Sequence, residues 1–228
     1  MATTIETLKS DPLVASVTAY ATAYMQNYDS SHDWAHIQRV VGLAHHLYEK
    51  APNKDSLDLR TIHLAALLHD VGDRKYIKPT EDPTNIISSL LLSFSSSTSP
   101  VTPEFASKIQ KICQGVSFSS EVKNGTDHVL SLISEHPELA IVQDADRLDA
   151  IGGVGIARMF TFGGAKKARS LQASVDHIDE KLIKLGGMMK TEEGKRLARE
   201  RTRRLEVLKG WWDEETAFAK GVEGVWGE

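Results

Sequence analysis

A histidine and an aspartate stand side by side at the end of an apolar run, LAALLHDVGD, as His69 and Asp70. Imidazole and carboxylate groups are good ligands for divalent metal ions. Because the apolar run predicts a buried helix, the pair would lie at a rim that water and substrate can reach. The doublet therefore indicates a metal site, and further ligands are expected elsewhere in the chain.

Two other segments carry groups that would complete such a site. SHDWAHIQRV places His32 and His36 four residues apart, on one face of a helix. IVQDADRLDAIGGVGIAR interrupts an apolar helical pattern with Asp144, Asp146 and Asp149, and carboxylates are rarely buried unless they are paired or hold a metal. Read together, the segments predict two histidine and two carboxylate ligands from three helices: His36, His69, Asp70 and Asp146.

The order H…HD…D resembles the HD-domain superfamily of metal-dependent phosphohydrolases. The segments SHDWAHIQRV, AALLHDVGDRKY, QDADRLDAIGGVGIAR and HIDEKLIKLGGMMKTEEGKRLARERT resemble its small YedJ/YpgQ-type members, over residues 20 to 215 or so. This resemblance implies an all-α helical bundle, one bound divalent metal ion and hydrolysis of a phosphate ester or anhydride. Similar members hydrolyse nucleoside triphosphates to monophosphate and pyrophosphate, so a nucleotide is the expected substrate. Manganese is the expected ion, with Mg, Fe, Co, Ni or Zn as alternatives.

The fourth metal ligand has two candidates. Asp144 and Asp146 lie two residues apart and would point roughly 200° apart on a helix, so only one should face the metal. The superfamily's Ala-Asp dipeptide falls on Ala145-Asp146 and favours Asp146, with Asp144 as the alternative. Whichever carboxylates do not bind the metal, Asp149 included, would accept hydrogen bonds from the histidine rings.

Several residues are expected to act on the substrate. His32 would protonate the leaving group, with Asp33 orienting its ring, although His32 could instead be a helix cap or support a ligand. Arg74 and Lys75 follow the doublet and would neutralise phosphate charge. Substrate-binding groups are also predicted in the segment that resembles the family tail, although lysines on helices are usually solvated: His177, Lys181 and Lys184.

Three other functions remain open at this point. A nucleotide phosphomonoesterase or phosphodiesterase would use the same ligands, and a non-catalytic nucleotide-binding domain would only need the fold. An HD-like metal oxygenase would need more histidines, and Val116 stands where relatives often place one. A serine-rich stretch at 93–99 resembles an insertion, so the substrate preference is expected to differ from that of the bacterial members.

Composition limits the class of protein. The chain has 228 residues, of which 41% are hydrophobic and 25% charged, which predicts a single domain over 1–228 with a metal-site core at about 20–160 and C-terminal helices at about 166–219. A net charge of −4 gives no field that would attract a long nucleic acid. Cys113 is the only cysteine, and neither a signal peptide nor a membrane span is found. We therefore expect a cytoplasmic protein with a small phosphorylated substrate, and a homodimer is possible.

Apolar spacing predicts helices along most of the chain. Stripes run through 13–24 and 37–47, and a third helix at 57–68 would have Asp55 or Ser56 as its N-cap and end at Gly72. The serine-rich stretch around 93–103 and the segment GVSFSSEVKNG at 115–125 are predicted as loops, the first a surface loop or mobile lid, and Gly163-Gly164 as a break. Further helices are expected at 82–92, 104–114, 127–134, 141–159, 166–185 and 191–219.

Overall fold

The fold is built from helices alone. The computed structural model describes residues 3–26, 28–73, 77, 82–165 and 169–220, and all regular elements within these ranges are helical, which confirms the all-α prediction. No helix in the described part of the chain is both long and apolar enough to cross a bilayer. The α-helices are α1 (Ile5–Lys9), α2 (Pro12–Met25), α3 (Trp34–Lys50), α4 (Leu59–Leu68), α5 (Ile86–Ser93), α6 (Pro103–Val116), α7 (Phe118–Asn124), α8 (Thr126–Glu135), α9 (Glu138–Asp149), α10 (Gly152–Ala165), α11 (Leu171–His177), α12 (Ile183–Gly186) and α13 (Glu192–Lys220).

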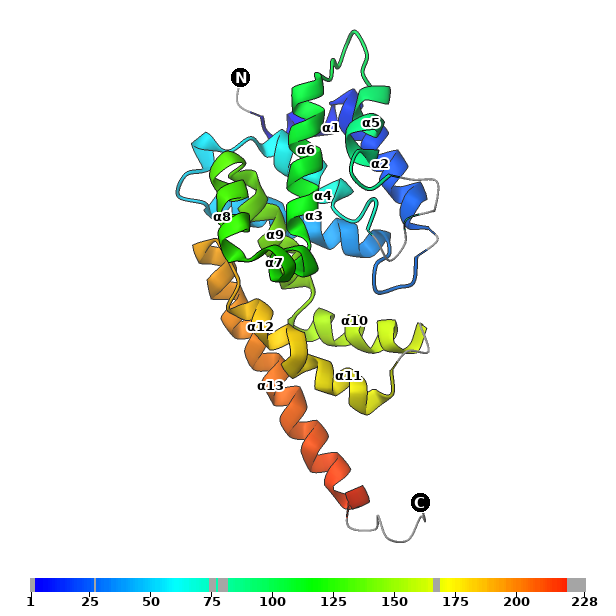
Figure 1. Cartoon of the computed structure of the whole chain (residues 1–228), viewed down its shortest axis with the longest axis vertical. Coiled ribbons are helices and arrows are strands. Elements are labelled where there is room, and N and C mark those ends of the chain that lie inside the picture. Colours follow the sequence, from blue (N-terminus) through cyan, green and yellow to red (C-terminus); the bar gives the residue numbers. More distant parts are fainter. Residues whose placement is uncertain (1–2, 27, 74–76, 78–81, 166–168, 221–228) are drawn as a thin grey trace.

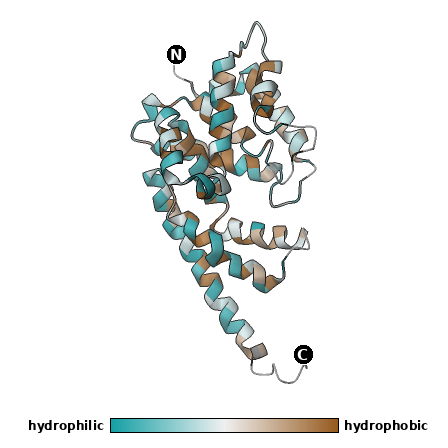
Figure 2. Ribbon diagram, in the orientation of Figure 1, coloured by the Kyte–Doolittle hydropathy of each residue, from teal (hydrophilic) through white to brown (hydrophobic). Residues whose placement is uncertain are grey.

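The helices form an upper bundle and a lower extension (Figure 1). Helix α3 packs against α4 and α9 at the centre of the bundle, and α6 closes it on another side. The lower extension consists of α10 to α12 and the long α13, which runs down one side of the molecule. Figure 2 shows many hydrophobic residues along the helices of the upper bundle. The central helices contribute fully buried side chains at Val40, Ile62 and Val142.

Two of the helices that position the predicted ligands, α3 and α4, begin at aspartate caps. The Asp33 carboxylate accepts a hydrogen bond from the backbone N–H of His36, which fixes the first turn of α3. Asp58 caps α4 by accepting from Arg60 N and Thr61 N, so the predicted caps Asp55 and Ser56 are wrong and lie in a preceding 3₁₀ turn, Lys54–Ser56. Two N–H groups are satisfied at Asp58, which is why the helix starts there.

The chain turns away from α4 at Gly72, as predicted. Its φ of 81° is a left-handed conformation that favours glycine, and an added Cβ would lie 2.9 Å from Ile86 Cγ2. The serine-rich segment 94–102 that follows α5 contains no helix, also as predicted. It is not a free lid, because Ser99 is buried and donates a hydrogen bond to Asp11.

The segment 115–125 is not a loop. Helix α6 continues to Val116 and α7 covers most of the remainder. Packing overrides the low helix propensity of its serines and glycines: Glu121 is buried and pairs with Arg147 and Lys190, which fastens α7 to the bundle.

The predicted aspartate helix 141–159 is two helices. Helix α9 ends at Asp149, and α10 begins at Gly152, whose φ of 73° produces the bend. The predicted break at Gly163-Gly164 is also wrong, because α10 runs through both glycines. A Cβ on Gly163 would lie 2.7 Å from Ser174 Oγ, so this glycine allows α10 and α11 to approach closely.

The predicted helix 166–185 is interrupted. Helix α11 is followed by a π-helical turn, Ile178–Leu182, and then by the single turn of α12. Residues 166–168 lie outside the described part of the chain. The last predicted helix, 191–219, agrees closely with α13.

Candidate metal centre

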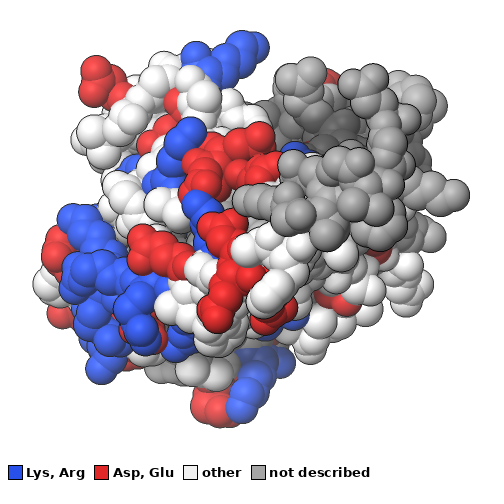
Figure 3. Space-filling model, turned by 90° about the horizontal axis from the view of Figure 1, so that it is seen from below, with Lys and Arg blue, Asp and Glu red and all other residues white. Residues whose placement is uncertain are grey.

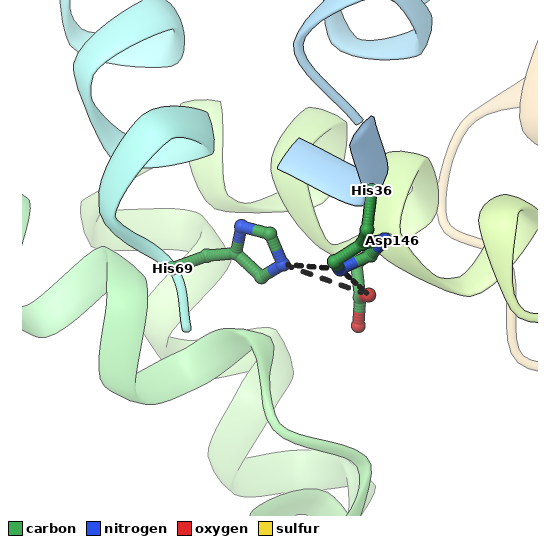
Figure 4. Close-up of side chains that lie close together, drawn as sticks. All are labelled: His36, His69 and Asp146. Atoms are coloured by element: carbon green, nitrogen blue, oxygen red, sulfur yellow. Dashed lines mark hydrogen bonds and ion pairs between the residues drawn. The ribbon is translucent and has the colours of Figure 1, made fainter. Parts of the chain in front are cut away.

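Two histidines and an aspartate from three helices converge inside the bundle (Figure 4). His36 lies in the first turn of α3, His69 follows the last residue of α4, and Asp146 lies in the last turn of α9. His36 Nε2 lies 3.2 Å from His69 Nε2 and 3.7 Å from Asp146 Oδ1. Two ligand atoms that each lie about 2.1 Å from one ion are separated by about 3 to 4 Å, so these three atoms can share a metal.

Asp70 faces the same point. Its Oδ2 atom lies 3.3 Å from His36 Nε2, and its Oδ1 atom lies 3.6 Å from His69 Nε2. The Oδ2 atom is buried and has no hydrogen-bond partner among the described residues. A buried carboxylate oxygen without a partner is costly unless a cation compensates it. This orphaned oxygen, together with the oxygen and imidazole groups around it, fits a divalent metal ion.

The electrostatics of the cluster also favour a cation. Burial raises the pKa of Asp70, but the charges of the neighbouring His69 and His36 outweigh it and hold that pKa well below its usual value. Burial also opposes ionisation of Asp146, and His69 again lowers its pKa. Burial lowers the pKa of His69, but the charges of Asp70 and Asp146 raise it to about 9. A divalent cation bound here would replace that proton.

A third carboxylate supports His36 from the opposite side of its ring. His36 Nδ1 lies 2.8 Å from Asp149 Oδ2. The Asp149 carboxylate also accepts from Arg39 Nε at 2.7 Å and from Arg158 Nη1 at 3.0 Å. Burial raises the pKa of Asp149, but His36 and Arg39 lower it to about 2. An ionised carboxylate on Nδ1 orients the ring and makes Nε2 the atom that faces the ligand cluster.

The other side of α9 holds the C-terminal helices. The Asp144 carboxylate accepts hydrogen bonds from Lys190 N, Thr191 N and Thr191 Oγ1, which leaves it outside the ligand cluster and corrects its prediction as an alternative ligand. The neighbouring Arg147 is buried and donates to Glu121 and to the backbone oxygen of Met188. Positions 144 and 147 therefore attach the lower helices, whereas 146 and 149 serve the cluster.

A cavity of about 200 Å³ lies next to His32. Its polar wall carries four groups that are cationic or can become so: Arg158, Arg169, His177 and Lys181. Its apolar wall includes Met159, Phe162 and Leu182. The His32 ring also lies 6.0 Å from the ring of His36, centroid to centroid, and 5.9 Å from that of Phe162. His32 thus belongs both to the cavity and to the surroundings of the ligand cluster.

The predicted catalytic residues fall in different places. His32 Nδ1 contacts Ser31 Oγ at 2.7 Å, and Ser31 also donates to Asp29. Asp33 is the cap of α3, and the partner that the structure shows for His32 Nδ1 is Ser31 instead. Arg74 and Lys75 lie outside the described residues.

Of the three predicted substrate-binding residues, two line the cavity and one does not. His177 and Lys181 line the cavity, where burial lowers the pKa of His177 and Lys181 Nζ lies 4.9 Å from the centroid of the Phe118 ring. His177 precedes the π-helical turn and Lys181 lies within it, before α12 begins. Lys184 is exposed and is not among the residues that line the cavity, because it follows the π turn on another face.

Sequence reasoning overlooked Arg39, Arg158, Arg169 and Phe162. Arg39 and Arg158 stand at or near the ends of SHDWAHIQRV and IGGVGIAR, but the sequence pattern assigned neither of them a function. An i,i+3 spacing from His36 could have indicated Arg39, because residues three apart share a helix face. Nothing local indicates Arg158, which donates to Asp149 and, through Nε, to the backbone oxygen of Ser31 far away in the chain.

The sequence profile of the HD domain matches residues 33–151, and this chain belongs to the HD domain family. It is 35% identical over 188 residues to YpgQ of Bacillus subtilis, covering 81% of this chain and 84% of that protein. The crystal structure of B. subtilis YpgQ in complex with ADP superposes with a TM-score of 0.66 at 29% identity, covering 89% of this chain and 94% of that one. An HD-superfamily hydrolase from Bacillus thuringiensis gives a TM-score of 0.62 at 28% identity, covering 93% and 98%. Members of this family are metal-dependent, and the resemblance read from the sequence is confirmed.

Proposed function

We propose that this chain is a metal-dependent phosphohydrolase that converts a nucleoside triphosphate to the monophosphate and pyrophosphate. The observation that carries the proposal is the position of His32. It lines the cavity of about 200 Å³, and the centroid of its ring lies 6.0 Å from that of His36. A substrate in that cavity would meet the ligand cluster at one end. The crystallisation of the related YpgQ with ADP supports a nucleotide as the occupant.

The metal would be held by His36, His69, Asp70 and Asp146. When bound, it would lower the pKa of a coordinated water and polarise a phosphoryl oxygen. Asp149 would keep the His36 ring in place, because its carboxylate is ionised and fixed by Arg39 and Arg158. The protein supplies a rigid ligand set, since each donor comes from a packed helix or its end.

The cavity would bind the substrate in two parts. The apolar wall at Met159, Phe162 and Leu182 suits a nucleobase, and the groups at Arg158, Arg169 and Lys181 suit phosphate oxygens. Arg74 and Lys75 remain candidates for further phosphate contacts. The mixed wall favours a small anionic ligand with one flat apolar end.

His32 would donate a proton to the leaving oxygen. Because the Ser31 hydroxyl donates to Asp29, it accepts from His32 Nδ1, and Nε2 is then the ring nitrogen that would exchange a proton with the substrate. The relay Asp29–Ser31–His32 would stabilise the protonated ring. Ser31, not Asp33, would therefore position the general acid.

Metal-dependent hydrolysis with product identification tests the proposal. Chelator-treated protein should be inactive, Mn²⁺ should restore hydrolysis, and phosphorus NMR with a panel of nucleotides should show pyrophosphate. His36→Ala should lose bound metal, whereas His32→Ala should keep it and lose roughly 10²- to 10⁴-fold in turnover. His128→Ala, at an exposed position on α8, is the matched control. Orthophosphate from monophosphates, with triphosphates untouched, would establish a phosphomonoesterase, and binding without turnover under every metal would contradict an enzyme.

A further inference from the structure

A second pair of histidines bridges α3 and α4 outside the ligand cluster. His45 Nε2 on α3 lies 2.9 Å from His63 Nδ1 on α4, and the centroids of the two rings are 5.1 Å apart. His45 follows His36 by nine residues, which is about 14 Å along the axis of a helix that rises about 1.5 Å per residue. The two histidine pairs therefore join the same two helices at different levels.

Both rings of the second pair are neutral near pH 7. Burial lowers the pKa of His45, and the charge of Glu49 opposes the shift. Burial and the charge of His45 lower the pKa of His63, against the charge of Asp11. A neutral imidazole is the form that binds a metal ion. Because neither ring is fully buried, an ion can reach both from solvent.

The distance between the two nitrogen atoms fits one coordination geometry. Two nitrogen ligands that lie about 2.0 to 2.1 Å from an ion and at right angles to each other are about 2.8 to 3.0 Å apart. Right-angled nitrogen ligands are typical of tetragonal Ni²⁺ and Cu²⁺ sites, and imidazole suits these ions better than Mn²⁺ or Mg²⁺. A tetrahedral Zn²⁺ ion would need a separation of about 3.4 Å, so the rings would have to move apart slightly. The ion would replace the hydrogen bond that now joins the two rings.

A carboxylate is available as a third ligand. Glu49 lies one turn after His45 on the same face of α3. It pairs with Lys54 at 3.1 Å, and both side chains are about half exposed, so this ion pair is weak and easily released. Asp11 is held instead by Arg60, whose Nε donates to it at 2.6 Å, and by a backbone N–H of α2. Glu49 is therefore the acidic group that can turn toward the pair.

We propose that His45 and His63, together with Glu49, form a second metal site that takes an imidazole-preferring transition-metal ion, Ni²⁺ or Cu²⁺ in type. The ion would tie the middle of α4 to α3 and so brace the two helices that position His36 and His69. It would stabilise the fold without contacting the substrate. The proposal does not depend on which phosphate bond the chain hydrolyses.

Other surfaces of the molecule also offer oxygen ligands. Figure 3 views the chain from below and shows Asp and Glu side chains exposed near the middle of that face. Exposed carboxylates bind hard cations such as Mn²⁺ and Mg²⁺, whereas a pair of imidazoles selects the borderline ions. Selectivity for the ion and a comparison of histidine variants thus distinguish the proposed site from background binding.

Native mass spectrometry and isothermal titration of the full, untagged chain with Ni²⁺ test the site. The parent protein should bind two ions, and His36→Ala, His45→Gln and His63→Gln should each bind one. Loss of one imidazole should weaken the second site by more than the roughly 10- to 100-fold that loss of an outer partner costs. His46→Gln is the matched control, because His46 is the exposed neighbour of His45 and bonds to Glu193 instead. Mn²⁺ should give one ion in the parent protein.

Stability provides a second readout. In the His36→Ala background, Ni²⁺ should raise the unfolding temperature, and the further change His45→Gln should abolish the rise. Circular dichroism without metal checks that the variants are folded. A parent protein that binds one Ni²⁺ ion contradicts the proposal, as do two ions retained in both His45→Gln and His63→Gln. Loss of metal in His36→Ala alone concerns the ligand cluster, so failure of the second site and failure of the proposed function give different results.

Discussion

The Nδ1 atom of His36 lies 2.8 Å from Oδ2 of Asp149, although the two residues are 113 positions apart in the chain. The contact joins α3 to α9 at the point where both contribute to the ligand cluster. Asp149 also accepts hydrogen bonds from Arg39 and Arg158. A single carboxylate therefore fixes the orientation of one imidazole and two guanidinium groups. Removal of its charge should therefore disturb the cluster without removing any ligand.

Asp149→Asn is expected to lower the affinity for the metal by roughly 10- to 100-fold, the usual effect of losing a carboxylate behind a ligating histidine. Isothermal titration of the chelator-treated protein with Mn²⁺ measures it. Asp144→Asn is the matched control, because it weakens the attachment of α13 and leaves the cluster intact. Equal losses of affinity in the two variants would mean that Asp149 has no special relation to the metal.

Arg158→Ala is expected to reduce turnover roughly 10- to 100-fold while metal content stays close to that of the parent protein. The arginine donates both to Asp149 and to the backbone oxygen of Ser31, so its loss frees the segment that carries His32. Arg158→Lys keeps the charge but cannot make both contacts, and it should recover little of the rate. Metal content by elemental analysis and turnover by steady-state kinetics distinguish an effect on metal binding from an effect on the segment that carries His32. Unchanged turnover in Arg158→Ala would contradict the role of Arg158 in positioning that segment.

Metal binding should stabilise the fold. With free Mn²⁺ at about 100 times its dissociation constant, the gain is about 2.7 kcal/mol, or roughly 5–10 °C in the unfolding temperature of a chain of this size. Asp70→Asn should abolish this gain, because it removes a charged ligand from the cluster. Differential scanning calorimetry with and without chelator provides the measurement. If the unfolding temperature of the parent protein is the same with and without metal, the ligand assignment is wrong.

Two glycines of IGGVGIAR should respond differently to alanine. A Cβ on Gly155 would lie 2.3 Å from the backbone oxygen of Ala150, at the bend between α9 and α10, whereas a Cβ on Gly153 meets nothing within 4 Å. Gly155→Ala should lower the free energy of unfolding by about 1–3 kcal/mol. Gly153→Ala should be neutral or raise it by up to about 1 kcal/mol, since alanine favours the helix. Urea unfolding compares them, and similar values for both would show that the bend adjusts freely.

Stability should fall in acid through a histidine pair away from the metal centre. His63 Nδ1 lies 2.9 Å from His45 Nε2, and burial together with the charge of His45 lowers the pKa of His63 to about 4, with Asp11 opposing the shift. A pKa below the unfolded value of 6.5 means that this contribution is present above pH 6.5 and is lost as the pH falls through about 4. His63→Gln should reduce the loss in the free energy of unfolding between pH 7 and pH 4 by roughly 1–3 kcal/mol. Urea unfolding at pH 4 to 7 measures the difference, and His128→Gln, at an exposed position, should leave the slope unchanged.

The ligand cluster could be predicted from the sequence because its donors stand in short segments with local signals. The doublet His69-Asp70 ends an apolar run, and the structure brings both residues to His36 and Asp146. The helical period indicated that only one of Asp144 and Asp146 should face the metal, and the family's Ala-Asp dipeptide favoured Asp146. Asp144 does point elsewhere, toward the N–H groups at the start of α13.

The cavity was less accessible to sequence reasoning. Arg158 and Phe162 acquire their positions from the bend at Gly152, and the sequence pattern gave one continuous helix there. The segment 115–125 became helical because Glu121 finds Arg147 and Lys190, two partners that lie far along the chain. Contacts of this kind depend on the assembled fold, so local propensity predicts the opposite.

The π-helical turn Ile178–Leu182 acts as a register shift between two otherwise regular helices. A π turn holds one residue more than an α turn, so every side chain after it is rotated by about 100° from where an unbroken helix would place it. His177, just before the turn, and Lys181, within it, line the cavity, whereas Leu185 after the turn belongs to the core. A deletion of one residue within the turn would suit helical geometry yet move the packing of α12 out of phase with α13. The length of this segment, as much as its composition, thus determines which residues line the cavity next to His32.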